Sequence, residues 1–414
     1  MGYDLIVIGG GPAGMLGAAA AAEKGLTVIL FEKNEKLGKK LYLTGKGRCN
    51  VTNNGDMEDF LHNITTNKKF LYSSFYSFNN QSLIELLNSL GVKTKVERGN
   101  RVFPLSDKSS DVIKALTKHL QTNHVEVRLN NEVKQVLAKD ENVTGVLLKD
   151  GNMIRGRNVL VATGGLSYRQ TGSTGDGYKM ASHLGHSVIE PKPALVPLLS
   201  EDKWVKDLQG LTLKNVSVSA LVKNRVVAKQ FGELLFTHFG VSGPAVLSIS
   251  SFLRTYMAKA LPITLQLDLK PALSNEQLDA RLQRDFLKYQ GKHLKNALDD
   301  LLPQSMIPVI LNLSGVDEHK QVSQITRLER DKLVHTLKNL AITVTGTRPL
   351  DEAIITGGGI NTKEINPSTL ESKIIKGLYF AGEVINVDAL TGGYNLQIAF
   401  STGYLSGISA AQGL

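Results

Sequence analysis

The chain has 414 residues, of which 42% are hydrophobic and 21% charged, a composition ordinary for a soluble globular protein of two or three domains. Its single cysteine excludes an intramolecular disulfide and favours a reducing, cytoplasmic setting. The formal net charge of +10 suits anionic ligands, but the lysines and arginines are scattered and aromatic residues make up only 6%. Because these are too few for an obvious base-stacking platform, we do not expect nucleic acid as a partner.

The N-terminal stretch MGYDLIVIGGGPAG lacks the basic region of a signal peptide, and glycines soon interrupt its apolar run. Later apolar windows such as VLVATGG are far shorter than the roughly 20 residues that span a bilayer. We therefore expect no membrane partner.

The chain opens with a βαβ pattern. Residues 3–8 form a continuous apolar run typical of a strand buried in a parallel sheet, and residues 13–24 form an alanine-rich helix before the strand at 26–31. Apolar spacing predicts further helices over 81–91 and 110–121.

The middle of the chain changes texture twice. Short alternating segments over 125–165 predict a β-meander, and residues 191–269 read as antiparallel strands. Residues 274–339 are helical and highly charged, and 353–414 return to glycine-rich α/β texture. The fold class is thus α/β, with a Rossmann-type domain interrupted by a β-rich and a helical subdomain. The predicted boundaries are 1–190 and 341–414 for the interrupted domain, 191–273 for the β-rich subdomain and 274–340 for the helical one.

A dinucleotide fingerprint follows the first strand. GGGPAG (9–14) fits G-x-G-x-x-G, in which Gly9 permits the turn, Gly11 lets the backbone approach a pyrophosphate and Gly14 lets helix and strand touch. The second strand ends in Glu32, about 20 residues on, where a carboxylate can accept hydrogen bonds from a ribose. The fingerprint alone does not distinguish NAD from FAD.

The C-terminal segment favours a flavin. Residues 377–407 read as a strand, an acidic turn with Glu383, a glycine pair and a long helix that starts near Asn395. A helix N-terminus placed there suits the N1–C2=O edge of a flavin, where negative charge builds on reduction.

Five motifs in order give a resemblance that runs nearly end to end. The fingerprint, TGKGRCNVTN, GGLSYRQTGSTGDGYKMA, GELLFTHFGVSGPA and LYFAGEVINVDALTGGYNLQ together resemble the aminoacetone-oxidase-like (BaiN-like) family of FAD flavoproteins, in the glutathione-reductase-like class of folds. Asn386 and Ala389 depart from the acid and the glycine that we expect at their positions. The resemblance implies FAD in the interrupted Rossmann domain, with substrate reached through the inserted module.

The expected FAD contacts combine the fingerprint with the residues that the resemblance implies. Val133 is expected to meet the adenine through its backbone, and Arg48 to pair with the pyrophosphate. The full set is Gly9, Gly11, Pro12, Ala13, Gly14, Glu32, Lys33, Thr44, Arg48, Asn50, Val133, Thr163, Gly164, Gly382, Glu383, Gly393, Asn395 and Leu396.

The lone cysteine, Cys49, could be a nucleophile, half of a redox pair, a flavin attachment point or a small filler in a tight loop. A dithiol mechanism needs two cysteines in one motif, so it is excluded. We favour the filler, because free cysteine commonly packs as a small apolar residue.

Candidates for acid–base chemistry are few. His238, in FTHFGVSGP of the inserted module, could act as acid, base or orienting group, although a structural role is equally compatible with its sequence context. Tyr394 is a second catalytic candidate and Arg348 a weaker one. No HExxH, H-x-x-H or CxxC spacing occurs, so the sequence supports no metal site.

These features predict an FAD-dependent oxidoreductase acting on a small molecule. The first hypothesis is oxidation of a small amine such as aminoacetone, with oxygen as acceptor. The second is an NAD(P)H-dependent reductase of an enone-like substrate, which the lack of a second G-x-G-x-x-G mildly disfavours. The third is a flavin-dependent protein that modifies or binds nucleic acid.

Overall fold

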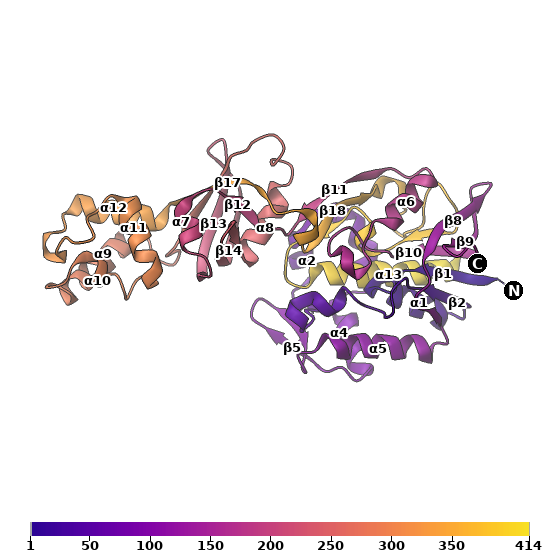
Figure 1. The fold of residues 1–414 in the computed structure, drawn as a ribbon. Helices are drawn as coiled ribbons and strands as arrows, with labels where there is room; N and C mark the ends of the chain where they lie inside the picture. Colours follow the sequence, from indigo (N-terminus) through magenta and orange to yellow (C-terminus); the bar gives the residue numbers. More distant parts are fainter. Residues whose placement is uncertain (1, 414) are drawn as a thin grey trace. The chain divides into compact units, whose positions relative to one another are not determined.

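The computed structural model describes residues 2–413 and divides the chain into two compact units. The first unit comprises Met1–Pro193 and Leu350–Leu414, and the second comprises Ala194–Pro349. The second unit is thus inserted within the first. We describe each unit by itself (Figure 1).

The first unit is built on a seven-stranded sheet. In spatial order it runs through β7 (Glu126–Arg128), β2 (Val28–Phe31), β1 (Tyr3–Ile8), β10 (Met153–Val161), β9 (Asn142–Leu148) and β8 (Val133–Lys139), with β19 (Leu378–Phe380) also paired to β10. The pairs around β1 and β2 and the β10–β19 pair are parallel, whereas β8, β9 and the first part of β10 form an antiparallel meander. The predicted meander is confirmed for β8–β10, but β7 belongs to the parallel part.

Helices α1 (Pro12–Glu23) and α13 (Tyr394–Gln412) pack against each other on one face of this sheet (Figure 1). Their small residues set the distance between them. A Cβ atom at Gly403 would lie 2.2 Å from the carbonyl oxygen of Ala13, and one at Gly407 would lie 2.2 Å from that of Gly17. Real Cβ atoms do not approach so closely, so this packing requires glycine at both positions of α13.

The remaining elements of the first unit surround the sheet. The predicted helices are confirmed as α4 (Asn80–Ser89) and α5 (Ser109–Thr122), and α5 contributes to the same core as α1. Further helices are α2 (Met57–Asn63), η2 (Lys68–Leu71), α3 (Tyr72–Ser77) and α6 (Asp176–His183). One small sheet consists of β3 (Thr52–Asn53), β6 (Arg101–Pro104) and β5 (Thr94–Glu97). Two others are pairs, β20 (Asp388–Ala389) with β4 (Ile64–Thr66) and β11 (Val188–Ala194) with β18 (Ile355–Ile360).

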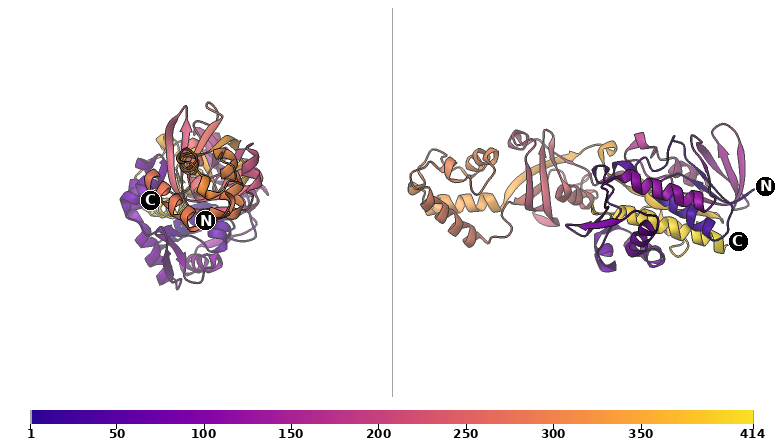
Figure 2. Two further views of the ribbon diagram at one scale, coloured as in Figure 1. Left: turned by 90° about the vertical axis from the view of Figure 1, so that its left-hand side faces the viewer. Right: turned by 90° about the horizontal axis from the view of Figure 1, so that it is seen from below.

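The second unit is a closed barrel with a group of helices. The barrel runs through β12 (Leu198–Ser200), β15 (Gly240–Ser242), β14 (Arg225–Thr237), β13 (Thr212–Val222), β16 (Ile263–Asp268) and β17 (Leu340–Thr347). Helices α7 (Lys203–Asp207) and α8 (Pro244–Leu253) accompany it. The orange helices in Figure 2 are α9 (Asn275–Lys288), α10 (Leu294–Ala297), α11 (Ile307–Ser314) and α12 (Arg327–Lys338).

Two of the predicted boundaries are corrected by this arrangement. The chain returns to the first unit at Leu350 and not at 341, because β17 pairs with both β16 and β12 to close the barrel. The β-rich and helical parts also form one unit, because a single apolar core contains Leu267 of the barrel together with Leu278 and Leu333 of the helices. The strand pairing that closes the barrel and the apolar core that the barrel shares with the helices therefore set the boundaries of the second unit, which composition did not reveal.

Candidate functional site

Helices α1 and α13 of the first unit each begin after a glycine and lack a side-chain cap. Helix α1 begins after Gly11 and α13 after Gly393, and neither residue offers a side chain to the first free N–H groups. A Cβ atom at Gly11 would have no heavy atom within 4 Å, so space is open in front of α1. Free N–H groups and the helix dipole favour negative charge, so both ends suit an anionic or electron-rich ligand.

Glu32 lies at the end of β2, beside the glycine turn, and its side chain is buried. Its Oε2 accepts a hydrogen bond from the Gly10 backbone N at 2.8 Å, and its Oε1 accepts from the Asn34 backbone N at 2.9 Å. The carboxylate therefore holds the fingerprint loop in shape. Glu32 directly follows β2, in agreement with its predicted place at the end of the second strand, and carboxylate lone pairs beyond these bonds could accept from a ribose.

A hollow of about 360 Å³ is lined in part by Lys33, Asn131, Leu148 and Lys149, and Lys33 follows Glu32 directly in the chain. The Lys33 ammonium lies 2.7 Å from an oxygen of Asp176. Val133 is the first residue of β8, as predicted, and it directly follows residues 130–132, which also line the hollow. These residues could hold the adenosine part of a dinucleotide.

Two buried polar atoms of the site have no hydrogen-bond partner: Oδ1 of Asn50 and Oγ1 of Thr163. An unmade hydrogen bond at a buried group costs about 1–3 kcal/mol, so such atoms call for an explanation. Both belong to the predicted FAD contacts. Together with the open space at Gly11, they are compatible with a bound FAD molecule, which would offer these atoms partners.

Arg48 does not present a free guanidinium. It bonds the carboxylates of Glu97 and Asp107, the second at 2.6 Å, and stacks 4.3 Å from the ring centroid of Phe103. The guanidinium holds the pKa of Glu97 below its usual value. These carboxylates accept from Nε and Nη2, so Nη1 is the nitrogen that a pyrophosphate would meet. The expected FAD contact of Arg48 remains a proposal, whereas its structural role in the loop is observed. Thr44, in the same loop, donates to the Leu41 carbonyl at 2.7 Å.

Cys49 is fully buried in the apolar core of the first unit. Burial raises the pKa of its thiol to about 12, so the thiol stays protonated at neutral pH. Because the thiolate is the reactive form, a nucleophilic role conflicts with this environment. The interpretation of Cys49 as a packed filler is confirmed.

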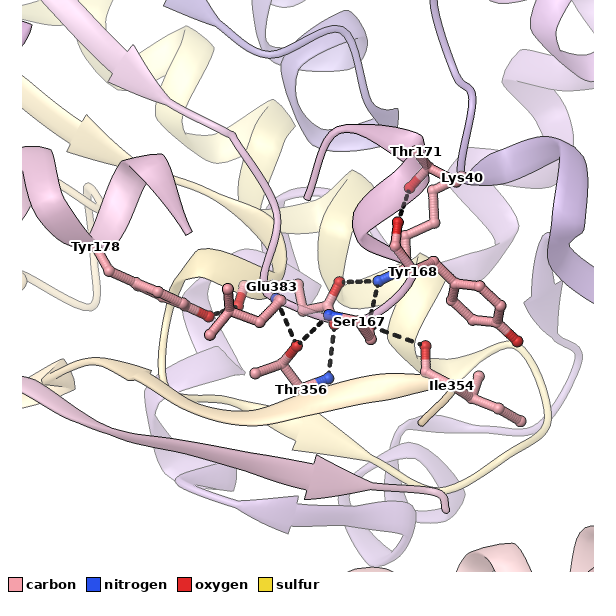
Figure 3. Close-up of polar contacts among 9 residues, drawn as sticks. Lys40, Ser167, Tyr168, Thr171, Tyr178, Ile354, Thr356 and Glu383 are labelled. Atoms are coloured by element: carbon pink, nitrogen blue, oxygen red, sulfur yellow. Dashed lines mark hydrogen bonds and ion pairs between the residues drawn. The ribbon is translucent and has the colours of Figure 1, made fainter. Parts of the chain in front are cut away.

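Glu383 forms the centre of a polar network, drawn in Figure 3. Its Oε2 lies 2.6 Å from the Lys40 ammonium, while its Oε1 accepts from the Ser167 hydroxyl at 3.1 Å and from the Thr356 backbone N at 2.7 Å. The Thr356 hydroxyl in turn accepts from the backbone N of Leu166 at 2.7 Å. The network joins the turn that follows β10, which contains Ser167, to strand β18, which contains Thr356. Sequence reasoning missed Lys40, Ser167 and Thr356 because their hydrogen-bonding partners are far away along the chain.

The turn before α13 is fixed by one amide. The Oδ1 of Asn395 accepts from the Ala389 backbone N at 2.9 Å, and its Nδ2 donates to the Ala389 carbonyl at 2.8 Å. A Cβ atom at Gly393 would lie 2.3 Å from the Thr52 carbonyl oxygen, and the residue has a φ of 99°, so only glycine fits. Asn395 and Leu396 thus stand in the first turn of α13, where a flavin edge could meet free N–H groups.

The other predicted FAD contacts lie at three turns. Gly9, Gly164 and Gly382 adopt positive φ angles, which permit the chain to bend closely there. Gly14 lets α1 touch the fingerprint turn, since a Cβ atom there would lie 1.9 Å from the Gly9 carbonyl oxygen. Pro12 starts α1, as its fixed φ favours.

The catalytic candidates lie in different units. Tyr394 belongs to the first unit, packs edge-on against Phe60 at 5.0 Å, and has a pKa raised by burial. His238 belongs to the second unit, is exposed, and packs edge-on against Phe239 at 5.0 Å. Arg348 stacks on the same Phe239 ring at 4.7 Å. No contact tests the proposed role of His238.

Among residues 2–413, no three His, Cys, Asp or Glu side chains gather as metal ligands would. Within the same range, no helix combines the length and the apolar character that crossing a membrane requires.

The chain matches the family described as HI0933-like protein Rossmann domain over residues 3–409. It belongs to this family. The match confirms the FAD-type Rossmann fold and the resemblance found in the sequence. FAD is the cofactor of this family member, and the chain is an FAD-dependent oxidoreductase.

Three relatives match nearly end to end. The chain is 30% identical to the 3-dehydro-bile acid delta(4,6)-reductase of Clostridium scindens over 98% of both chains. It is 31% identical to the ribosomal RNA dihydrouridine synthase of Haemophilus influenzae over 98% of both, and 32% identical to that of Escherichia coli over 97% of this chain and 96% of the relative.

Among solved structures, the 3-ketosteroid delta1-dehydrogenase of Sterolibacterium denitrificans covers 99% of both chains with a TM-score of 0.54 and 15% identity. A likeness at this identity shows the fold alone.

Proposed function

We propose that this chain reduces a carbon–carbon double bond conjugated to a carbonyl, and that its substrate is a uracil base in RNA. The observation that carries the proposal is the end-to-end similarity to two chains named as ribosomal RNA dihydrouridine synthases, at 31% and 32% identity. Dihydrouridine is uridine with its C5=C6 bond saturated, and that bond is conjugated to the C4 carbonyl. The bile acid reductase relative bears a name that describes the same class of reaction.

The residues of the first unit suit this chemistry. FAD bound there supplies the transfer of a hydride between a donor and the substrate. The uncapped N-terminus of α13 would stabilise negative charge on the electron-rich ring edge beside it. Tyr394 in the first turn carries its hydroxyl proton at neutral pH, since burial raises its pKa further above the ordinary value, so it could donate a proton and could not act as a base.

The overall step is balanced with a nicotinamide donor. NAD(P)H loses a hydride, which arrives on the carbon β to the carbonyl, while a proton is added to the α carbon. The TGGG segment at 356–359 does not supply a second dinucleotide turn, because it lies in the fully buried strand β18. We therefore expect the nicotinamide donor to bind without a Rossmann turn of its own.

RNA as a substrate reverses the expectation drawn from composition. The net charge of +10 now has a partner of opposite sign, since phosphate contacts supply much of the affinity of proteins for nucleic acid. Oxidation of a small amine with oxygen, and a role for His238 in it, remain predictions that the same experiment tests.

The test incubates the FAD-loaded protein with NADPH or NADH and an unmodified ribosomal RNA transcript. Nuclease digestion and mass spectrometry then measure dihydrouridine. We expect dihydrouridine that depends on both protein and donor. Parallel reactions offer a 3-oxo-diene steroid with the same donors, and aminoacetone with oxygen. Reduction of the steroid alone would contradict the RNA substrate but not the reductase, whereas peroxide from aminoacetone without any reduction would establish the oxidase.

A further inference from the structure

A basic and aromatic surface lies in the first unit, outside the residues discussed so far. It consists of Lys68, Lys69, Tyr72 and Tyr76, on η2 and the following helix α3, and we call it the α3 ridge. Tyr76 is 91% exposed, the highest value among the large apolar and aromatic side chains that are exposed, and Tyr72 is 49% exposed. We propose that the α3 ridge binds a single-stranded segment of the RNA substrate; this inference rests on the proposed function.

The orientation of the ridge follows from the opposite face of the same segment. Phe70, Leu71 and Phe75 are buried, and Phe75 packs edge-on against Phe60 at 5.6 Å. With these residues turned inward, the two tyrosines, four positions apart on α3, lie on one outer face. The buried side of α3 thus fixes the helix, and both tyrosines extend from its exposed side.

The charge of the ridge complements a nucleic acid. Lys68 and Lys69 are exposed, and within the described residues neither ammonium group has an ion-pair partner. This is different from the lysines around the cofactor site, where Lys33 and Lys40 are paired with carboxylates. Unpaired cations beside open aromatic rings match single-stranded RNA, in which phosphates alternate with bases that stack on aromatic side chains.

The ridge is joined to the strand that leads into α13. Strand β4 precedes η2 and pairs with β20, in the register Asp388 with Thr66. The side chain of Asn67 donates to the Asn386 carbonyl at 2.8 Å, and the Thr65 hydroxyl donates to the Asp388 carbonyl at 3.0 Å. Strand β20 in turn leads to Gly393 and the N-terminus of α13. RNA held on the α3 ridge would therefore lie on a segment that is hydrogen-bonded to β20, the strand that leads to the predicted cofactor site.

The test measures the binding of fluorescein-labelled oligouridylate to the FAD-loaded protein by fluorescence anisotropy. We expect Tyr72→Ala together with Tyr76→Ala to weaken binding about tenfold or more, because stacking contributes substantially per base. Tyr72→Phe with Tyr76→Phe should keep most of the affinity, since the rings remain. Phe231→Ala is the control, since Phe231 is 58% exposed and lies in the second unit.

A salt series tests the lysines. Lys68→Ala with Lys69→Ala should reduce the slope of log Kd against log salt by about 1.4, since each phosphate contact on a single strand contributes about 0.7. The control pair is Lys114→Ala with Lys118→Ala, two exposed lysines on α5 that should leave the slope unchanged.

Several outcomes would overturn the inference. Wild-type protein that does not bind the oligonucleotide, or ridge variants that bind and form dihydrouridine as the wild type does, would each do so, and the second result would leave the proposed function intact. Ridge-dependent sedimentation with phosphatidylglycerol vesicles and no RNA binding would assign the surface to a membrane instead. Conversely, ridge-dependent binding without dihydrouridine formation would support the ridge and contradict the proposed function.

Discussion

Four helices, two in each unit, begin in opposite ways. In the second unit, α9 and α12 begin with complete capping boxes, formed by Ser274 with Gln277 and by Thr326 with Glu329. In the first unit, α1 and α13 begin at Gly11 and Gly393, with no side-chain cap. Other helices do not follow this division, since Asn79 caps α4 in the first unit and α8 in the second unit begins after Gly243 without a side-chain cap. In these four helices, side chains bond the first N–H groups of α9 and α12, whereas α1 and α13 leave theirs free for a ligand.

The pattern extends to buried polar atoms. The unpartnered Asn50 and Thr163 oxygens stand in the cofactor site of the first unit. Glu32 in the same unit bonds the fingerprint loop, and its ribose contact remains a proposal. Unpartnered buried atoms also occur at Ser74, His186 and Ser217, so it is their place among the predicted FAD contacts that associates Asn50 and Thr163 with the cofactor site.

The largest effect is expected from the contact between the two uncapped helices. Gly403→Leu would force a side chain into the carbonyl of Ala13, at a Cβ distance of 2.2 Å, and should lower the free energy of unfolding by on the order of 3 kcal/mol or prevent folding. Urea denaturation measures the change. Gly291→Ala is the control, because a Cβ atom there meets nothing within 4 Å, and should change stability by less than about 0.5 kcal/mol. Equal effects of both would contradict the close approach.

The next effect concerns FAD. Glu32→Ala should weaken FAD binding by roughly 1–3 kcal/mol, because it removes charge-assisted hydrogen bonds at a buried position. Titration of the apoprotein with FAD, followed by flavin fluorescence, measures the loss. Glu35→Ala, at an exposed carboxylate paired with Lys39, should leave the affinity unchanged. FAD that remains with the protein after acid precipitation would show a covalent link and contradict reversible binding.

A cap in the second unit should matter less and only for stability. Thr326→Ala removes the hydroxyl that accepts from the Glu329 backbone N at 3.3 Å, and should cost about 1 kcal/mol in the unfolding of the second unit. Urea unfolding, followed by the fluorescence of Trp204 in that unit, measures the change. The FAD content should stay the same. A lost cofactor would mean that the two kinds of helix end are not separate in function.

The smallest effect is expected at Cys49. Cys49→Ser should keep FAD and lower turnover by less than about tenfold, because the thiol packs and does not react. Burial raises the pKa of the Cys49 thiol to about 12, so the buried thiol favours the folded state most at pH values below the ordinary thiol pKa. This stabilisation is lost as the pH rises toward 12, because the thiol of the unfolded chain ionises first. Native protein at pH 8 should therefore resist iodoacetamide, while urea-unfolded protein reacts. Rapid labelling of the native protein would contradict the packed thiol.

The sequence by itself determined the parts that depend on neighbours along the chain. The strand, glycine turn and helix of the fingerprint, and Glu32 at the end of the next strand, follow from local spacing and lie where predicted. The helices α4 and α5 likewise follow from their apolar periodicity. Local backbone preference and patterning are enough for these elements.

Only the tertiary structure decided the parts that depend on distant pairing. Residue Leu340 begins a barrel strand because its partners lie in β16 and β12, which no window of sequence around it contains. Arg48 reads as a phosphate ligand in its loop, yet two carboxylates some 50 residues away hold it. Lys40 and Glu383 are 343 residues apart in sequence and form one ion pair. Such contacts exist only once the chain has folded, because folding brings together charges and strand edges whose spacing along the sequence carries no signal.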